Sequence, residues 1–264
     1  KLIEGKSDDV PGGSLVRLAL EVEPGIILPF HLITPIGAKG KTPAVVMLAQ
    51  GGKSVFLKQR SDVIAAFLKA NISVCLVDVR GTGETQAGDG SPGRGGSRTS
   101  ISQTNLILGQ PVIGSQLRDL RTFVRWLQSR PEIDGQKLAI WGESFTRVNE
   151  PQAIFAVPLD APDLPAYADP AAPLLASLGA LFEDGVRVVY SNGGLSSYRA
   201  IVESPYVYVS HDIIIPGAQV VFDLALPPVI QRKSAGFGSN IDGMNRPVGN
   251  AVASPETASQ QMIE

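Results

Sequence analysis

Three short apolar runs, separated by segments with helical spacing, constrain the fold of this chain most. The runs cover residues 44–49, 73–77 and 137–141. Short continuous apolar runs are typical of strands buried on both faces of a parallel sheet. Between them, apolar residues recur at helical spacing over residues 61–71 and 113–127. This alternation predicts an α/β fold with a mostly parallel central sheet, right-handed crossovers and helices on both faces.

Other segments complete a single expected α/β domain over residues 1–264. Residues 15–22 and 25–34 are rich in β-formers and predict an N-terminal antiparallel hairpin. Residues 174–182 and 186–190 predict a further helix and strand, and residues 233–243 a weak strand followed by a turn. Two stretches lack periodicity. We expect residues 81–109 to form a long surface loop and the proline-rich residues 148–170 to be irregular.

Composition excludes several classes of partner. The net charge is about −2 and the basic residues are scattered, which argues against nucleic acid and anionic membranes. No apolar run approaches the roughly 18 residues of a membrane span. Cys75 lies in an apolar run and is expected to be a buried hydrophobe, and the sequence shows no metal-ligand cluster. We expect no cofactor. The first residues carry no signal-peptide core, and localisation and oligomeric state stay open.

Ser144 is the candidate nucleophile. It follows the apolar run at residues 137–141 in the sequence Gly142-Glu143-Ser144. A strand that ends in Gly-x-Ser and then turns sharply exposes the serine oxygen at the edge of a sheet. The alternative is a serine that caps a helix, but a cap does not explain the preceding strand and glycine.

Backbone N–H groups are the candidate oxyanion donors. One is the N–H of Phe145, directly after the serine, and the other is the N–H of Gly52 in the turn after residues 44–49. Glycines in that turn allow the backbone to approach a substrate closely, and Gln50 is placed to contact it. In the next turn, Arg80 has two interpretations. It either forms a structural ion pair with Asp78 or faces the pocket and binds substrate.

The small number of histidines limits the choice of general base. The chain has two, His31 and His211, and His31 falls inside a predicted strand far upstream. His211 is therefore the candidate general base. We favour Asp242 as the acid that orients it, because Asp242 ends the weak late strand. Asp212, Glu203 and Asp223 are the alternatives.

The chain resembles bacterial α/β-hydrolase esterases of the acetyl xylan esterase-like and dienelactone hydrolase-like type. The resemblance rests on residues 48–52, on Asp78-Val79-Arg80-Gly81-x-Gly83, on Arg130-Pro131-Glu132-Ile133-Asp134 after a helix, and on Gly142-x-Ser144. It implies an α/β-hydrolase fold and hydrolysis of an ester, with an acetyl group on carbohydrate as the substrate.

The chain departs from the family pattern at three points. Thr146 replaces the closing glycine of G-x-S-x-G, a proline-rich segment follows the serine, and no histidine follows Asp242. The leading hypothesis is a serine carboxylesterase acting on a small-molecule or carbohydrate ester. The alternatives are an esterase-like fold that has lost catalysis and binds carbohydrate or protein, and a peptidase of the prolyl oligopeptidase type.

Overall fold

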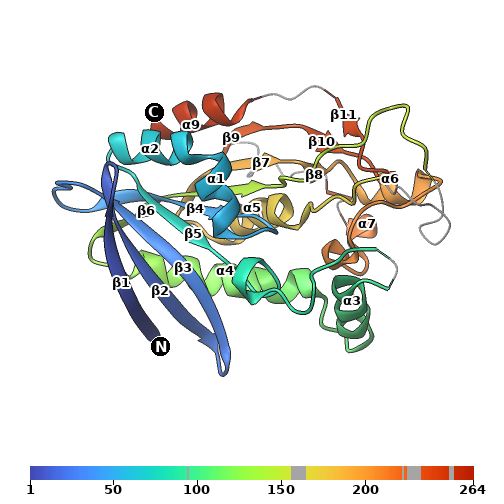
Figure 1. Ribbon diagram of the computed structural model, residues 1–264, viewed down its shortest axis with the longest axis horizontal. Coiled ribbons are helices and arrows are strands. Elements are labelled where there is room, and N and C mark those ends of the chain that lie inside the picture. The colour runs from blue at the N-terminus through green and yellow to red at the C-terminus, as the bar shows by residue number, and fades with distance from the viewer. Residues whose placement is uncertain (94, 156–164, 222, 225–232, 250–252) are drawn as a thin grey trace.

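The computed structural model describes residues 1–93, 95–155, 165–221, 223–224, 233–249 and 253–264. A sheet of eight strands runs through it in the order β1-β2-β3-β5-β4-β6-β7-β9 (Figure 1). Its strands are β1 (Leu2–Val10), β2 (Gly13–Glu23), β3 (Ile26–Pro35), β4 (Thr42–Leu48), β5 (Ser73–Val77), β6 (Ile133–Glu143), β7 (Val186–Asn192) and β9 (Ser234–Phe237). β1 to β3 pair antiparallel and β3 joins β5 antiparallel, whereas β5, β4, β6, β7 and β9 are parallel. The predicted fold class is confirmed, including the N-terminal hairpin.

Helices cover both faces of this sheet (Figure 1). On one face lie α1 (Lys53–Gln59), α2 (Ser61–Lys69) and α9 (Pro255–Ile263), and on the other lie α4 (Val112–Gln128) and α5 (Ala171–Phe182). Successive side chains of β4 alternate between the two cores: Val46 packs with the α4–α5 side, and Val45 and Met47 with the α1–α2 side. This alternation explains why β4 reads as a continuous apolar run.

Smaller elements gather beyond the end of β7. β8 (Gly194–Leu195) follows β7 directly and forms a three-stranded sheet with β10 (Asn240–Ile241) and β11 (Pro247–Val248). The remaining described helices are α3 (Ser97–Ile107), α6 (Tyr198–Glu203) and α7 (Ala218–Val221), with 3₁₀ turns η1 (Gly83–Thr85) and η2 (His211–Ile213). No helix among the described residues is both long and apolar enough to cross a bilayer.

The prediction of a long surface loop at residues 81–109 is wrong in part, because this segment contains helix α3. This helix buries Arg98, Thr99 and Ser102 rather than an apolar stripe. A helix whose buried face is polar gives no hydrophobic periodicity, so the sequence pattern could not reveal it.

Candidate active site

Ser144 lies at the carboxyl end of the central strand β6, between the ends of β4 and β7. Its backbone N–H donates to the carbonyl of Asn192 at 2.9 Å, which extends the pairing of β6 with β7 by one residue. The Ser144 side chain is half-buried. Ligands of open α/β sheets bind at this edge, so the serine lies where a substrate would bind.

The backbone at Ser144 does not form the strained elbow that the sequence pattern predicts. Ser144 is absent from the four non-glycine residues with positive φ in the described chain. The next helix, α5, begins only at Ala171. The hydrogen bond from the Ser144 N–H to Asn192 continues the β6–β7 pairing up to the serine. Gly142 is required for another purpose, since a Cβ there would lie 2.2 Å from the carbonyl oxygen of Ala172 in α5.

Glu143 anchors the end of β6. Its carboxylate is fully buried and accepts hydrogen bonds from the Nε1 of Trp141 at 2.9 Å and the Nδ2 of Asn192 at 3.1 Å. The guanidinium of Arg60 binds both carboxylate oxygens. Burial lowers the pKa of Arg60, but the hydrogen bond and charge of Glu143 outweigh it and raise that pKa overall. The residue before Ser144 is therefore held from three sides.

The turn after β4 is closed by its own hydrogen bonds. The N–H of Gly52 donates to the carbonyl of Ala49 at 3.0 Å, so it is not available as an oxyanion donor in this structure. Gly52 is a glycine because it sits at φ 72° and a Cβ would lie 2.5 Å from Asp78 Oδ1. Close approach to Asp78, rather than to a substrate, explains this residue. By contrast, the N–H of Phe145 has no acceptor in the part of the chain that the structure describes.

Gln50 bridges two turns at the same edge. Its Nε2 donates to the carbonyl of Gly81 at 2.8 Å. Its side-chain oxygen is buried and has no hydrogen-bond partner among the described residues. A buried carbonyl oxygen without a donor is rare in folded proteins, so this oxygen marks the turn as a candidate functional position.

Arg80 and Asp78 do not pair with each other, so the interpretation as a structural Asp78–Arg80 ion pair is wrong. Arg80 binds Asp119 of α4 through its Nε at 2.8 Å and Glu23 of β2 at 3.1 Å. Its pKa is raised by the hydrogen bond to Asp119, against the effect of burial. Asp78 instead binds the Lys53 Nζ at 2.6 Å. The two side chains diverge because Lys53 begins α1 and Asp119 belongs to α4, on opposite faces of the sheet. Arg80 is therefore fastened to the scaffold.

The structure does not bring the predicted base and acid together with the serine. His211 begins η2 and is half-buried, but no hydrogen bond joins it to Ser144 in the described chain. Asp242 lies in the turn between β10 and β11, where its carboxylate binds groups of the same turn. Its Oδ1 accepts from the N–H groups of Met244 and Arg246, and its Oδ2 accepts from the Nε of Arg246 at 2.8 Å. Asp242 therefore has a structural role here.

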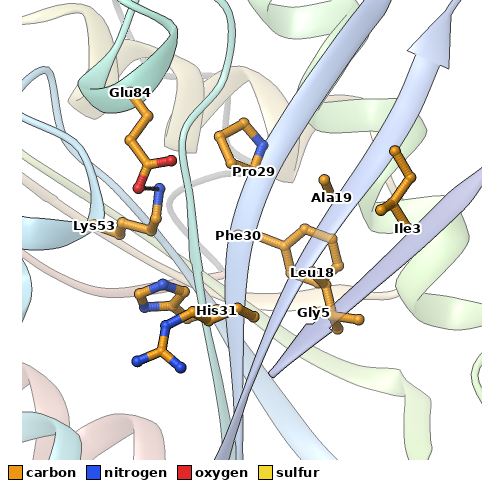
Figure 2. A pocket seen from close by; sticks show the side chains of 10 residues that line it. Ile3, Gly5, Leu18, Ala19, Pro29, Phe30, His31, Lys53 and Glu84 are labelled. Carbon is orange, nitrogen blue, oxygen red and sulfur yellow. Dashed lines mark ion pairs between the residues drawn. The ribbon is translucent and has the colours of Figure 1, made fainter. Parts of the chain in front are cut away.

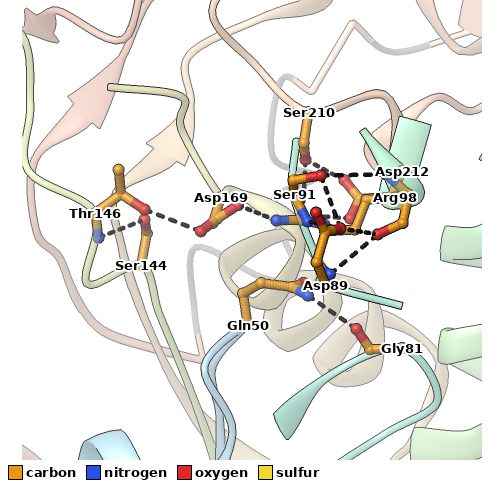
Figure 3. A network of polar contacts seen from close by, with 12 residues as sticks. Gln50, Gly81, Asp89, Ser91, Arg98, Ser144, Thr146, Asp169, Ser210 and Asp212 are labelled. Carbon is orange, nitrogen blue, oxygen red and sulfur yellow. Dashed lines mark hydrogen bonds and ion pairs between the residues drawn. The ribbon is translucent and has the colours of Figure 1, made fainter. Parts of the chain in front are cut away.

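A polar network that the sequence analysis missed lies between Ser144 and η2 (Figure 3). Arg98 binds Asp169 at 2.5 Å and Asp212 at 2.5 Å, and the Oγ1 of Thr146 donates to Asp169 at 3.0 Å. The N–H of Thr146 approaches the Oγ of Ser144 at 3.4 Å. No local pattern marks Arg98, because its partners lie far along the chain.

His31 lies on β3, as predicted, and lines a pocket of about 240 Å³ away from Ser144. Lys53 and Glu84, which form an ion pair with each other, line the same pocket as His31 (Figure 2). Burial and then the charges of Lys53 and Arg17 lower the pKa of His31 from its ordinary value of 6.5. Its Nδ1 is buried without a partner in the described residues.

The fold is similar to solved structures of esterases. A candidate acetyl xylan esterase from Bacteroides fragilis superimposes with a TM-score of 0.67 at 14% identity, over 91% of this chain and 63% of that one. Acetyl xylan esterase 1 from a Thermoanaerobacterium species gives a TM-score of 0.51 at 17% identity, over 77% and 56%. This chain therefore spans under two thirds of the length of either protein. No family model and no curated protein matches the sequence. The likeness confirms the α/β-hydrolase fold.

Proposed function

We propose that this chain is a carboxylic ester hydrolase with Ser144 as its nucleophile. The observation that carries the proposal is the placement of Ser144 on the central parallel strand, at the edge where such sheets bind ligands. Its hydroxyl is only weakly engaged, with the nearest N–H donor, that of Thr146, at 3.4 Å. The N–H of Phe145, which has no acceptor among the described residues, adjoins it and supplies an oxyanion donor.

In the proposed reaction, the Ser144 oxygen bonds to the ester carbonyl carbon and its proton passes to His211. The carbon–oxygen bond to the alcohol then breaks, and His211 returns the proton to the departing alcohol. Water hydrolyses the acyl-enzyme by the same route. Because His211 is not hydrogen-bonded to Ser144 here, substrate binding must bring the two together. We assign a Ser144–His211 dyad without Asp242, since Arg246 already occupies that carboxylate.

An acetyl group on carbohydrate is the proposed substrate. The support is analogy to the two acetyl xylan esterases that share the fold, and fold alone does not fix a substrate. Gln50 and Phe145 lie at the edge where the ester would bind. Arg80 is not assigned to the substrate, because Asp119 and Glu23 hold its guanidinium.

A second candidate is a binding module without chemistry for carbohydrate or protein. The specific observation in its favour is that Ser144 lacks the positive φ of a strained nucleophile turn. The N–H of Gly52, which already donates to Ala49, also favours the binding module. The two candidates differ in whether Ser144 reacts.

Hydrolysis of an activated acetyl ester and of acetylated xylo-oligosaccharides by four proteins separates these candidates. Wild type is compared with Ser144→Ala, His211→Gln and Ser100→Ala, where Ser100 is an exposed serine of α3. We expect kcat to fall at least about 10³-fold in the first two variants and to stay unchanged in the third. A serine-directed phosphonate should label Ser144 in wild type. Unlabelled wild type that still binds the oligosaccharide would establish the binding module, and activity that survives Ser144→Ala would refute the nucleophile.

A further inference from the structure

Arg98, the second residue of α3, is a buried cation that joins three segments of the chain. One terminal nitrogen binds Asp169 Oδ1 at 2.5 Å, just before α5. The other binds Asp212 Oδ2 at 2.5 Å and Ser210 Oγ at 3.0 Å, around η2. Only 9% of the Arg98 side chain is exposed.

Burying a charged cluster of this kind costs free energy, because the charged groups lose their hydration. Burial disfavours the charged guanidinium, yet Asp212 and Asp169 outweigh that effect and raise the pKa of Arg98, so it stays charged. A buried ion pair is often no more stabilising than well-packed apolar side chains of the same volume. Unlike apolar contacts, the hydrogen bonds of the charged cluster are directional, so each short bond fixes one segment of the chain relative to another.

Both ends of the cluster reach the proposed reacting groups. Asp169 uses its second oxygen to accept from the Oγ1 of Thr146 at 3.0 Å, two residues after Ser144. At the other end, Ser210 and Asp212 flank His211, and Ser210 donates to Asp212. The side chains of Ser210 and Asp212, one on each side of His211 in the sequence, are thus bound to the same guanidinium (Figure 3).

We propose that Arg98 is a positioning residue, which sets η2 and His211 relative to Ser144 through Asp212 and Asp169. This inference rests on the proposed function for its effect on activity. It also gives a reason for Thr146, where the family pattern has glycine. A glycine carries no hydroxyl and cannot join Asp169 to the serine segment.

The test compares Arg98→Met with Arg98→Lys and with Arg121→Met as a matched control. Arg121 also pairs with a buried carboxylate, that of Glu183, but it lies on α4. We expect Arg98→Met to lower kcat about 10²-fold with little change in KM, because displacement of a reacting group by about 1 Å costs a factor of this size. Arg98→Lys should recover part of the loss, and Arg121→Met should keep the wild-type kcat.

A second readout does not depend on activity. The chain has two histidines, so the imidazole NMR signals of His211 and His31 can be assigned with one substitution each. We expect the His211 signal to move in Arg98→Met, and the His31 signal to stay in place. Thr146→Val removes one bond of the network and should alter the rate at which the phosphonate labels Ser144, even if Arg98→Met fails to fold.

The outcomes separate the two proposals. A folded Arg98→Met protein with an unmoved His211 signal, or unaltered Ser144 labelling in Thr146→Val, overturns the positioning role. If wild type lacks esterase activity while the His211 signal moves as expected, the proposed function fails and the positioning of η2 by Arg98 stands.

Discussion

The turn after β4 and the turn after β6 end neighbouring parallel strands, yet they are built in opposite ways. In the first, Gly52 donates to Ala49 and Asp78 accepts from both the N–H and the Nζ of Lys53. In the second, the anchoring falls on Glu143, and the next residue, Ser144, keeps a weakly engaged hydroxyl. The backbone of the glycine-rich turn is occupied by its own contacts, and its one unpaired side-chain atom among the described residues, the Gln50 oxygen, is buried. The serine turn instead leaves polar groups free for a ligand.

This difference teaches that a glycine-rich turn at the edge of a sheet is not by itself a substrate site. The glycines after β4 make room for the Asp78 carboxylate, which neutralises the buried Lys53. The polar groups that this edge leaves free are therefore the hydroxyl of Ser144 and the N–H of Phe145. The predictions below test each half of the contrast.

The largest expected effect on stability is that of Gly52→Ala. Its φ of 72° costs an alanine about 1–2 kcal/mol, and the contact with Asp78 adds about 1–3 kcal/mol. We expect the free energy of unfolding, measured by urea denaturation, to fall by about 2–5 kcal/mol. Gly25→Ala is the matched control, with φ 77° and nothing within 4 Å. It should lose only the about 1–2 kcal/mol of the backbone term. Equal losses in the two variants would show that the turn is not tightly packed.

Arg60→Met tests the anchor of the serine turn. It leaves the buried Glu143 with hydrogen bonds from Trp141 and Asn192 but without a counter-charge. Breaking a fully buried ion pair costs about 3–5 kcal/mol. Because 23% of the Arg60 side chain is exposed, we expect about 2–3 kcal/mol in urea unfolding. Arg199→Met, which breaks a pair on the surface with Glu203, should leave the free energy of unfolding close to that of wild type. A loss as small as that of the control would mean that Glu143 does not depend on Arg60.

The sequence could predict the parts of this molecule that repeat a local pattern. β4, β5, β6 and α5 follow from apolar runs and helical spacing, and so does the placement of Ser144 after β6. The network around Arg98 could not be predicted, because its partners, Asp169 and Asp212, are distant in sequence and α3 buries polar side chains.

Side-chain partners at the strand ends were equally hidden from the sequence. Asp78 and Arg80 are two residues apart, but they turn to helices on opposite faces of the sheet. The spacing along the chain gives no sign of that divergence. Gly52 shows the same limit, since a glycine in a turn reads alike whether a substrate or a carboxylate approaches it.

Acidification should weaken the β4 side of the comparison through His31. Its folded pKa is below the ordinary value of 6.5, because of burial and the charges of Lys53 and Arg17, which Glu84 and Asp78 only partly offset. In the window between the lowered folded pKa and 6.5, the unfolded chain binds more protons than the folded one. Stability from this group is therefore complete above about pH 6.5 and lost as the pH falls through the folded pKa.

The slope of unfolding free energy against pH measures this effect. One proton contributes at most about 1.4 kcal/mol per pH unit. We expect wild type to lose stability as the pH falls below about 6.5, and His31→Gln to show a flatter profile there. Identical profiles for the two proteins would exclude His31 as the titrating group.

The smallest expected effect on stability is that of Ser144→Ala. Among the described residues the serine hydroxyl has one hydrogen bond, from the N–H of Thr146 at 3.4 Å, and the backbone bond to Asn192 does not need the side chain. We expect urea unfolding to change by no more than about 0.5 kcal/mol, although the same substitution is expected to abolish hydrolysis. A serine that matters for activity and not for stability is present for its reaction. A loss above about 1 kcal/mol would instead make Ser144 part of the scaffold, and the turn after β6 would then be closed by its own contacts in the same way as the turn after β4.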